Sequence, residues 1–191
     1  MVNGRQATVD LRVKVMSDYK PKDPPESILD IFLHPGEYYW GEENTRIRTL
    51  LGSCVSVALW HPVRQIGGMT HIMLPDSRGS RHAKFADVVI DMLLADIQKS
   101  NSRPSEFIAK VFGGGHMFSK LDQRFRKNGH VGQANVDAAF KLLNSHGFKI
   151  VAADTGGYRY RKLIFDIWSG DVYLQRQEQA PDWVDADPDE V

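Results

Sequence analysis

LLGSCVSVALW at residues 50–60 and IGGMTHIMLP at residues 66–75 are the two stretches that decide the fold of this chain. Both are rich in apolar and β-branched residues, and the segment His61-Pro62-Val63-Arg64 between them has the composition of a turn. The two stretches therefore predict a β-hairpin. Its first strand carries Cys54, the only cysteine of the chain, and its second strand carries His71.

The register of this hairpin determines whether the two side chains meet. A turn centred between Pro62 and Val63 pairs Cys54 with His71. Directly opposite residues point to the same side of a sheet with β-carbons about 4.5 to 5.5 Å apart, whereas a shift by one residue would separate them. A free cysteine is often only a small buried hydrophobe. A protonated histidine beside it would lower the pKa of the thiol and give the thiolate that attacks a carbonyl carbon.

Three glycines fit a reactive centre at this hairpin. Gly52 lies just before Cys54 and allows a bend that would expose the thiol and aim backbone N–H groups at a substrate carbonyl. Gly67 and Gly68 remove side chains from the histidine strand, as expected where another backbone or a substrate comes close.

Composition and charge narrow the class of protein. The chain has 191 residues, of which 42% are hydrophobic, and this is enough for the core of one domain. Its 24 basic and 24 acidic side chains cancel, so no overall field attracts nucleic acid or an anionic membrane. The unpaired cysteine indicates a reducing compartment, and no segment reads as a signal peptide or a membrane span. We expect a cytoplasmic protein without membrane insertion.

Hydrophobic periodicity predicts a mixed α/β or α+β domain built on a mixed sheet. Two amphipathic helices are expected, over residues 85–97 and 132–146. The expected strands cover residues 46–51, 55–60, 66–74, 107–112 and 148–153, followed by a closing hairpin over 162–168 and 172–174.

The flanks of the chain differ in composition from its centre. Residues 1–30 contain a proline-rich stretch and are expected to be an extension or linker. The folded domain is expected over residues 31–176. The acidic tail, residues 177–191, is expected to be disordered.

The pattern favours neither a metal nor a nucleotide cofactor. The chain has one cysteine and no closely spaced histidine pair, which is not the pattern of a zinc site. Gly113-Gly114-Gly115 lacks the Lys-Ser/Thr ending of a phosphate-binding loop. Asp154-Thr155-Gly156-Gly157 is either a tight turn or a binding element.

Six blocks of residues together resemble one known family, the chemoreceptor glutamine deamidases called CheD. They run in family order from about residue 31 to 176, and their combination is highly specific. The blocks are TLLGSC at 49–54, GGMTHIMLP at 67–75, KFAD at 84–87, KVFGGGHMF at 110–118, Gly132 with Asn135-Val136, and DTGG at 154–157.

The resemblance implies a three-layer α/β/α sandwich with an active-site β-hairpin. It also implies hydrolysis of selected glutamine side chains on chemotaxis receptors to glutamate, by a thiol mechanism without metal or organic cofactor. Cys54 matches the family nucleophile, His71 its general base and Thr49 its third catalytic residue.

The assignment of Thr49 conflicts with regular strand geometry. Residues 49 and 54 of one strand would lie on opposite faces, so a bend at Gly52 must bring them together. Ser56, which shares a face with Cys54, is the rival hydroxyl. The candidates for substrate or oxyanion binding are Gly52, Ser53, Ser56, Gly114 and His116.

Two other functions compete with a receptor deamidase. A thiol protease or transferase acting on another amide would use the same pair of residues. A non-enzymatic chemotaxis module would only dock on signalling proteins. The family resemblance also implies the chemotaxis phosphatase CheC as a possible partner.

Overall fold

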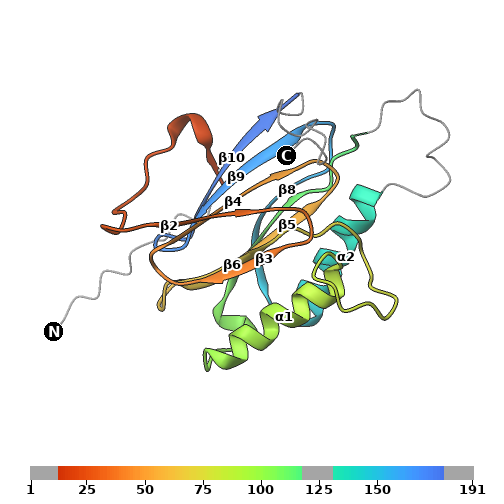
Figure 1. Ribbon diagram of the computed structural model, residues 1–191, viewed down its shortest axis with the longest axis horizontal. Helices are drawn as coiled ribbons and strands as arrows, with labels where there is room; N and C mark the ends of the chain where they lie inside the picture. The colour runs from red at the N-terminus through yellow and green to blue at the C-terminus, as the bar shows by residue number, and fades with distance from the viewer. Residues whose placement is uncertain (1–12, 118–130, 179–191) are drawn as a thin grey trace, which may run out of the picture.

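The computed structural model describes residues 13–117 and 131–178. These residues form two five-stranded sheets, each with parallel and antiparallel neighbours, and two α-helices (Figure 1). Among the described residues, neither helix is long and apolar enough to cross a membrane.

Sheet A contains both ends of the described chain. Its strand order is β1-β10-β9-β4-β2. The strands are β1 (Lys14–Val15), β2 (Leu29–Leu33), β4 (Thr45–Leu51), β9 (Tyr160–Asp166) and β10 (Asp171–Gln177). The pairs β1–β10 and β2–β4 are parallel, and the pairs β9–β10 and β4–β9 are antiparallel.

Sheet B contains the predicted hairpin at its centre. Its strand order is β3-β6-β5-β7-β8. The strands are β3 (Tyr38–Gly41), β5 (Val55–His61), β6 (Ile66–Thr70), β7 (Ile108–Gly113) and β8 (Lys149–Thr155). The helices are α1 (Ala86–Lys99) and α2 (Val131–Ser145), with short 3₁₀ turns at Met16–Asp18 and Pro104–Glu106.

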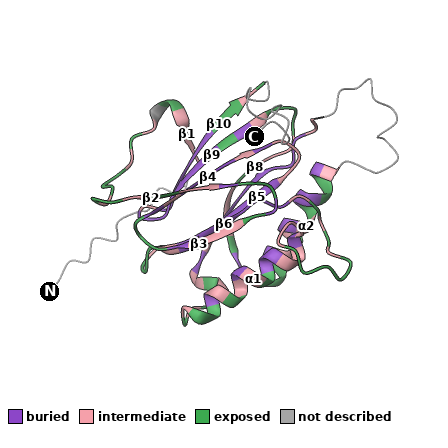
Figure 2. Ribbon diagram, in the orientation of Figure 1, coloured by how far each residue is buried: buried purple, intermediate pink, exposed green. Residues whose placement is uncertain are grey.

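Alternating burial explains why the sheets stack. Along β4 the side chains of Thr45, Ile47, Thr49 and Leu51 are buried, and those between them are partly exposed. This strand therefore has one face against sheet B, as period-two patterning requires. Every residue of β5 is buried because this strand is covered on both faces (Figure 2).

Two apolar clusters fill the spaces on either side of sheet B. The cluster between the sheets includes Ala58 and Trp60 of β5 and Phe165 of β9. The cluster between sheet B and the helices includes the intervening β5 residue Leu59 and residue Leu93 of α1. The molecule therefore has the layer order sheet A, sheet B, helices.

The mixed α/β class is confirmed, but the layering differs from the one that the resemblance implied. An α/β/α sandwich has one sheet between two layers of helices, whereas here a second sheet takes the place of one helix layer. The chain makes this exchange by leaving sheet A at Leu51 and entering sheet B at Val55.

The expected strands and both helices are confirmed within one or two residues for most of their ends. The expected hairpin register is wrong by two residues. Ala58 pairs with Met69, and His61 pairs with Ile66 across a four-residue loop. The His61 ring accepts hydrogen bonds from two amides of this loop, and Gln65 adopts a left-handed φ of 51°. This loop has the four residues that the sequence predicts, but it covers residues 62–65 instead of 61–64, which moves the pairing register by two.

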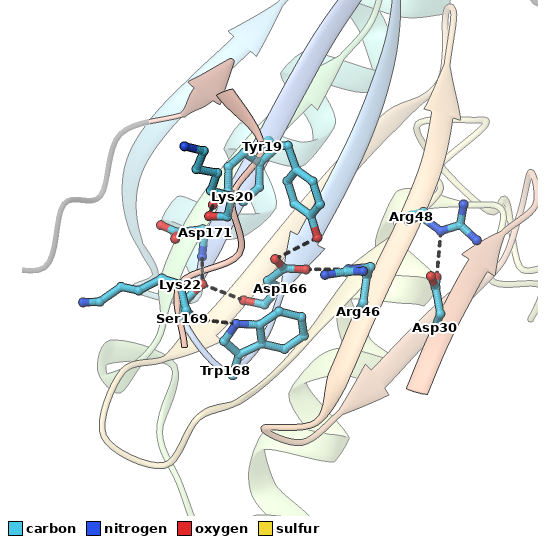
Figure 3. A network of polar contacts seen from close by, with 11 residues as sticks. Tyr19, Lys20, Lys22, Asp30, Arg46, Arg48, Asp166, Trp168, Ser169 and Asp171 are labelled. Carbon is cyan, nitrogen blue, oxygen red and sulfur yellow. Dashed lines mark hydrogen bonds and ion pairs between the residues drawn. The ribbon is translucent and has the colours of Figure 1, made fainter. Parts of the chain in front are cut away.

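The described part of the N-terminal region lies on the outer face of sheet A. β1 pairs with β10, the Tyr173 hydroxyl donates to the Lys20 carbonyl, and the Trp168 indole donates to the Lys22 carbonyl (Figure 3). The part of the predicted tail from residue 179 onward lies outside the described residues.

Candidate active site

The connection from β4 to β5 carries the predicted nucleophile across the space between the sheets. Thr49 is in sheet A, and Cys54 is the last residue before β5 of sheet B. The parity conflict between residues 49 and 54 therefore does not arise. Side chains on facing sheets point toward each other, and the bend at Gly52 and Ser53 is where the chain changes sheets.

His71 follows β6 directly and is held by its own backbone. Its N–H donates to the Glu37 carbonyl at 2.8 Å, and its carbonyl accepts from the Gly36 N–H at 2.9 Å. The side chain is only 3% exposed. The turn before β3 therefore fixes the position of this imidazole.

Thr49 and His71 form a hydrogen bond between the two sheets. The distance from Thr49 Oγ1 to His71 Nδ1 is 2.8 Å, and Thr49 Oγ1 also donates to the Leu33 carbonyl at 2.9 Å. A hydroxyl has one proton to donate, so Thr49 accepts from the imidazole if it donates to Leu33. This network assigns the proton to Nδ1 and leaves Nε2 as the free base.

The shifted register keeps Cys54 and His71 on the same face. Val55 pairs with Ile72, and continuing this register places Ser56 directly opposite His71 and Cys54 diagonally from it. A shift by an even number of residues does not change the face of a side chain. Within the part of the chain that the structure describes, the thiol makes no hydrogen bond to the imidazole. Catalytic contacts often tighten only when substrate binds.

Burial keeps both groups neutral in this structure. It raises the pKa of the Cys54 thiol to about 11. It also lowers the pKa of His71 to about 4, against the opposing effects of the Leu33 carbonyl and the Glu37 carboxylate. The sequence-based expectation of a thiol with a lowered pKa is therefore wrong for the resting state. The pair is a thiol beside a neutral imidazole.

The glycine run after β7 supports the turn at Gly52–Cys54. The N–H groups of Gly114, Gly115 and His116 donate to the carbonyls of Cys54, Gly52 and Gly157 at 2.8, 2.9 and 2.7 Å. The amides of Gly114 and His116 are thus already engaged. The amides of Ser53 and Cys54 have no acceptor among residues 13–117 and 131–178, so Ser53 remains a candidate oxyanion donor, and the Cys54 amide, which the sequence did not single out, becomes a second one.

Gly113 shows why glycine is needed at the end of β7. Its φ is +108°, and a β-carbon there would lie 2.1 Å from the Cys54 carbonyl oxygen. Any larger residue would therefore push the turn at Gly52–Cys54 away from β7.

Two buried polar side chains near the pair make fewer hydrogen bonds than they could. Ser56 Oγ is fully buried and has no partner in the described structure. Asn135 Nδ2 donates to the carbonyls of Ser53 and Met73. Sequence reasoning found Asn135 only as a matched family position, and the Leu33 carbonyl has no sequence signal at all.

A shallow hollow of about 660 Å³ lies next to the glycine run and is lined by residues 153–159, Arg161 and Arg176. The Gly156 N–H donates to the Gly113 carbonyl at 2.9 Å, so the DTGG turn is tied to the end of β7. Burial would raise the pKa of Asp154, but hydrogen bonds from Arg161 and Arg176 hold it below its usual value. The DTGG turn is thus held by ion pairs and braces the end of β7.

No group of three or more potential ligands in the described residues is arranged to hold a metal.

A family model and several individual proteins that resemble this chain all carry the name CheD. A family model described as CheD chemotactic sensory transduction matches residues 73–176. The "Probable chemoreceptor glutamine deamidase CheD 3" of Dechloromonas aromatica is 41% identical over 154 residues, which cover 78% of this chain and 89% of that protein.

Two further relatives are similar over nearly their whole length. The "Probable chemoreceptor glutamine deamidase CheD" of Pseudomonas savastanoi is 40% identical, covering 80% of this chain and 88% of that protein. "CheD 1" of Leptospira interrogans, which has the same description, is 36% identical, covering 82% and 98%. A solved structure, the hypothetical protein YfiH of Bacillus licheniformis, aligns with a TM-score of 0.42 at 12% identity over 82% of this chain and 75% of that one. The chain belongs to the CheD family.

Proposed function

We propose that this protein hydrolyses glutamine side chains of chemotaxis receptors to glutamate, with Cys54 as nucleophile. The relatives that match most of the chain are described as chemoreceptor glutamine deamidases. The observation that carries the mechanism is the hydrogen bond between Thr49 and His71 Nδ1, which leaves Nε2 free on the side of the ring away from Thr49.

The first half of the reaction forms a thioester. His71 Nε2 takes the proton of the Cys54 thiol as the sulfur attacks the carboxamide carbon, so no thiolate has to exist beforehand. The oxygen of the tetrahedral intermediate is bound by the N–H groups of Ser53 and Cys54, and such a donor typically contributes about 3 to 4 kcal/mol. His71 then gives its proton to the nitrogen, and ammonia leaves.

The second half releases the product. Nε2 removes a proton from a water molecule as that water attacks the thioester carbon. The carbon–sulfur bond breaks, glutamate remains on the receptor, and the thiol recovers its proton. Water supplies the oxygen of the new carboxylate, and no redox partner is required. Thr49 touches neither reacting atom and acts by keeping the proton on Nδ1.

The test is a deamidation assay with purified receptor cytoplasmic fragments. Mass spectrometry should find glutamine-to-glutamate conversion with the wild type and none with Cys54→Ala. Conversion by Cys54→Ala at the wild-type rate would contradict the assignment. Peptide fragments in place of intact deamidated receptor would instead point to a protease, and the absence of any covalent chemistry to a docking module.

A cytoplasmic location and a CheC-type partner extend this proposal. The location is inferred from the single unpaired cysteine, and the partner from the family resemblance. Co-purification with a CheC protein from the same organism would support the partner, and binding that fails with purified components would exclude it.

A further inference from the structure

Asn135 on α2 contacts both segments that carry the proposed catalytic residues. Its Nδ2 lies 3.3 Å from the Ser53 carbonyl and 2.9 Å from the Met73 carbonyl. Ser53 directly precedes Cys54, and Met73 is two residues beyond His71. The Asn135 side chain is completely buried. One carboxamide thus bridges the nucleophile segment and the histidine segment.

This bridge lies where the pairing between the two segments ends. Val55 and Ile72 exchange the last pair of backbone hydrogen bonds, at 2.9 and 2.7 Å. Beyond them Met73 turns away, and its N–H donates to the Lys84 carbonyl. Without a ladder at this point, the carbonyls of Ser53 and Met73 need another donor. The two N–H groups of the Asn135 amide supply it.

The position that lets Asn135 donate both hydrogen bonds leaves its own carbonyl oxygen without a partner in the described structure. This Oδ1 atom is buried. A buried acceptor without a partner typically costs about 1 to 3 kcal/mol. The other side chains on the buried face of α2, Val136, Ala139 and Leu143, are apolar. A polar residue kept here despite this cost is best explained by what its amide group holds.

We infer that Asn135 is a positioning residue that fixes the Cys54 segment against the His71 segment. This inference rests on the proposed function, because it concerns the geometry of the same reaction. In the resting structure no hydrogen bond joins thiol and imidazole, so their separation depends on the backbone that carries them. A misplacement of about 1 Å at a reacting group can cost roughly 100-fold in rate.

The test compares Asn135→Leu with Leu143→Ala in the full-length protein. Asn135→Leu keeps the approximate shape but removes the bridge, whereas Leu143→Ala weakens the apolar packing of the same helix and leaves both Asn135 hydrogen bonds in place. Two readouts are needed: kcat and KM for deamidation of receptor fragments, and the rate at which iodoacetamide alkylates Cys54 at one fixed pH. Because Cys54 is the only cysteine, alkylation reports on this thiol alone.

A positioning role predicts opposite changes in the two readouts. Asn135→Leu should lower kcat by about 10- to 100-fold with little change in KM. It should also speed alkylation, because a loosened segment exposes the buried thiol. Leu143→Ala should leave both within about twofold of the wild type, although core Leu→Ala changes cost about 2 to 5 kcal/mol of stability. Indistinguishable kcat and alkylation rates for the two variants would overturn the inference.

Asn135→Ser covers the case in which Asn135→Leu does not fold. Its hydroxyl can donate to one carbonyl, so kcat and alkylation should lie between those of the wild type and a variant without a bridge. Wild-type values for Asn135→Ser would overturn the inference. If the wild type itself fails to deamidate receptor fragments, the proposed function is wrong, while alkylation still decides the role of Asn135.

Discussion

Sheet A carries a polar cluster on each of its faces, and the two clusters differ in how completely they are paired. On the outer face Asp166 meets Arg46 and Tyr19, whereas on the inner face Thr49 meets His71 beside Cys54 (Figure 3 for the outer cluster). Arg46 and Thr49 belong to the same strand, β4, and point to opposite sides of it.

The outer cluster contains charges, and nearly all of them have partners. Asp166 is fully buried and accepts from Arg46 Nε at 2.8 Å and from the Tyr19 hydroxyl at 3.3 Å. The Arg46 guanidinium lies over the rings of Tyr19 and Trp168, at 5.2 and 5.3 Å, and its buried Nη2 has no acceptor in the described structure. Such a cluster holds the N-terminal segment onto sheet A.

The inner cluster contains no formal charge at neutral pH, and two of its members have no hydrogen-bond partner among the residues that the structure describes. The Cys54 thiol and the Ser56 hydroxyl are the groups concerned. Pairing on the outer face stabilises the fold, whereas unpaired polar groups on the inner face add little to stability and fit the proposed role of this face in catalysis. Substitutions on the two faces should therefore separate activity from stability.

The largest effect is expected from Cys54→Ala. Removing the proposed nucleophile should lower kcat by about 10⁴-fold or more, because the proposed thioester cannot form without the thiol. The free energy of unfolding should change by less than about 1 kcal/mol, since the thiol has no hydrogen bond to lose. Deamidation kinetics and urea denaturation measure the two quantities. If the variant lost activity only because it unfolds, the claim that the inner face serves activity and the outer face serves stability would be wrong.

Asp166→Asn should show the converse behaviour. It removes the charge that balances the partly buried Arg46, and breaking a buried ion pair typically costs about 3 to 5 kcal/mol. Urea denaturation should detect this loss. The kcat of the folded variant should match that of the wild type, and a hundredfold lower kcat would mean that the outer cluster takes part in catalysis.

The pH dependence of stability should report on the buried imidazole. His71 has a pKa of about 4 in the folded state, below its ordinary value of 6.5, so the unfolded chain binds the extra proton first as pH falls. Its contribution is complete above about pH 6.5 and is lost toward pH 4, by roughly 3 kcal/mol. The wild type should therefore lose more stability than His71→Gln between these pH values. Parallel curves would mean that the imidazole is accessible to protons in the fold.

The smallest effect is expected from Thr49→Val. This change removes a hydroxyl with little change in volume and leaves His71 Nδ1 and the Leu33 carbonyl without their partner. A hydrogen bond of this kind typically stabilises the correct orientation of the imidazole by about 1 to 3 kcal/mol. If the transition state loses that stabilisation, kcat should fall by about 10- to 100-fold. Thr49→Ser restores the hydroxyl and should restore most of the rate. Equal rates for the Val and Ser variants would show that the hydroxyl is unnecessary.

The sequence could predict most of the strands and helices, and the shared face of Cys54 and His71, because these depend on local patterns. Period-two runs located the strands, and the parity of Cys54 and His71 survived a register error of two residues. The second sheet could not be predicted, because whether β4 and β5 pair or face each other depends on packing of residues distant in sequence. The role of Thr49 was unclear for the same reason.

Contacts through backbone carbonyls also could not be predicted. The Leu33 carbonyl orients Thr49, and the Ser53 and Met73 carbonyls select Asn135, but every residue type carries the same carbonyl group. The raised pKa of the Cys54 thiol likewise follows from burial that only the packed sheets create.

The central claim is that the Cys54 sulfur carries the acyl group of the substrate. The most direct measurement is intact-protein mass spectrometry after an acid quench during turnover of a receptor fragment. Acylation of Cys54 predicts a covalent adduct of enzyme and receptor that hydroxylamine cleaves and that is missing with Cys54→Ala. Continued glutamine-to-glutamate conversion by the Cys54→Ala protein, without an adduct at any time, would contradict it.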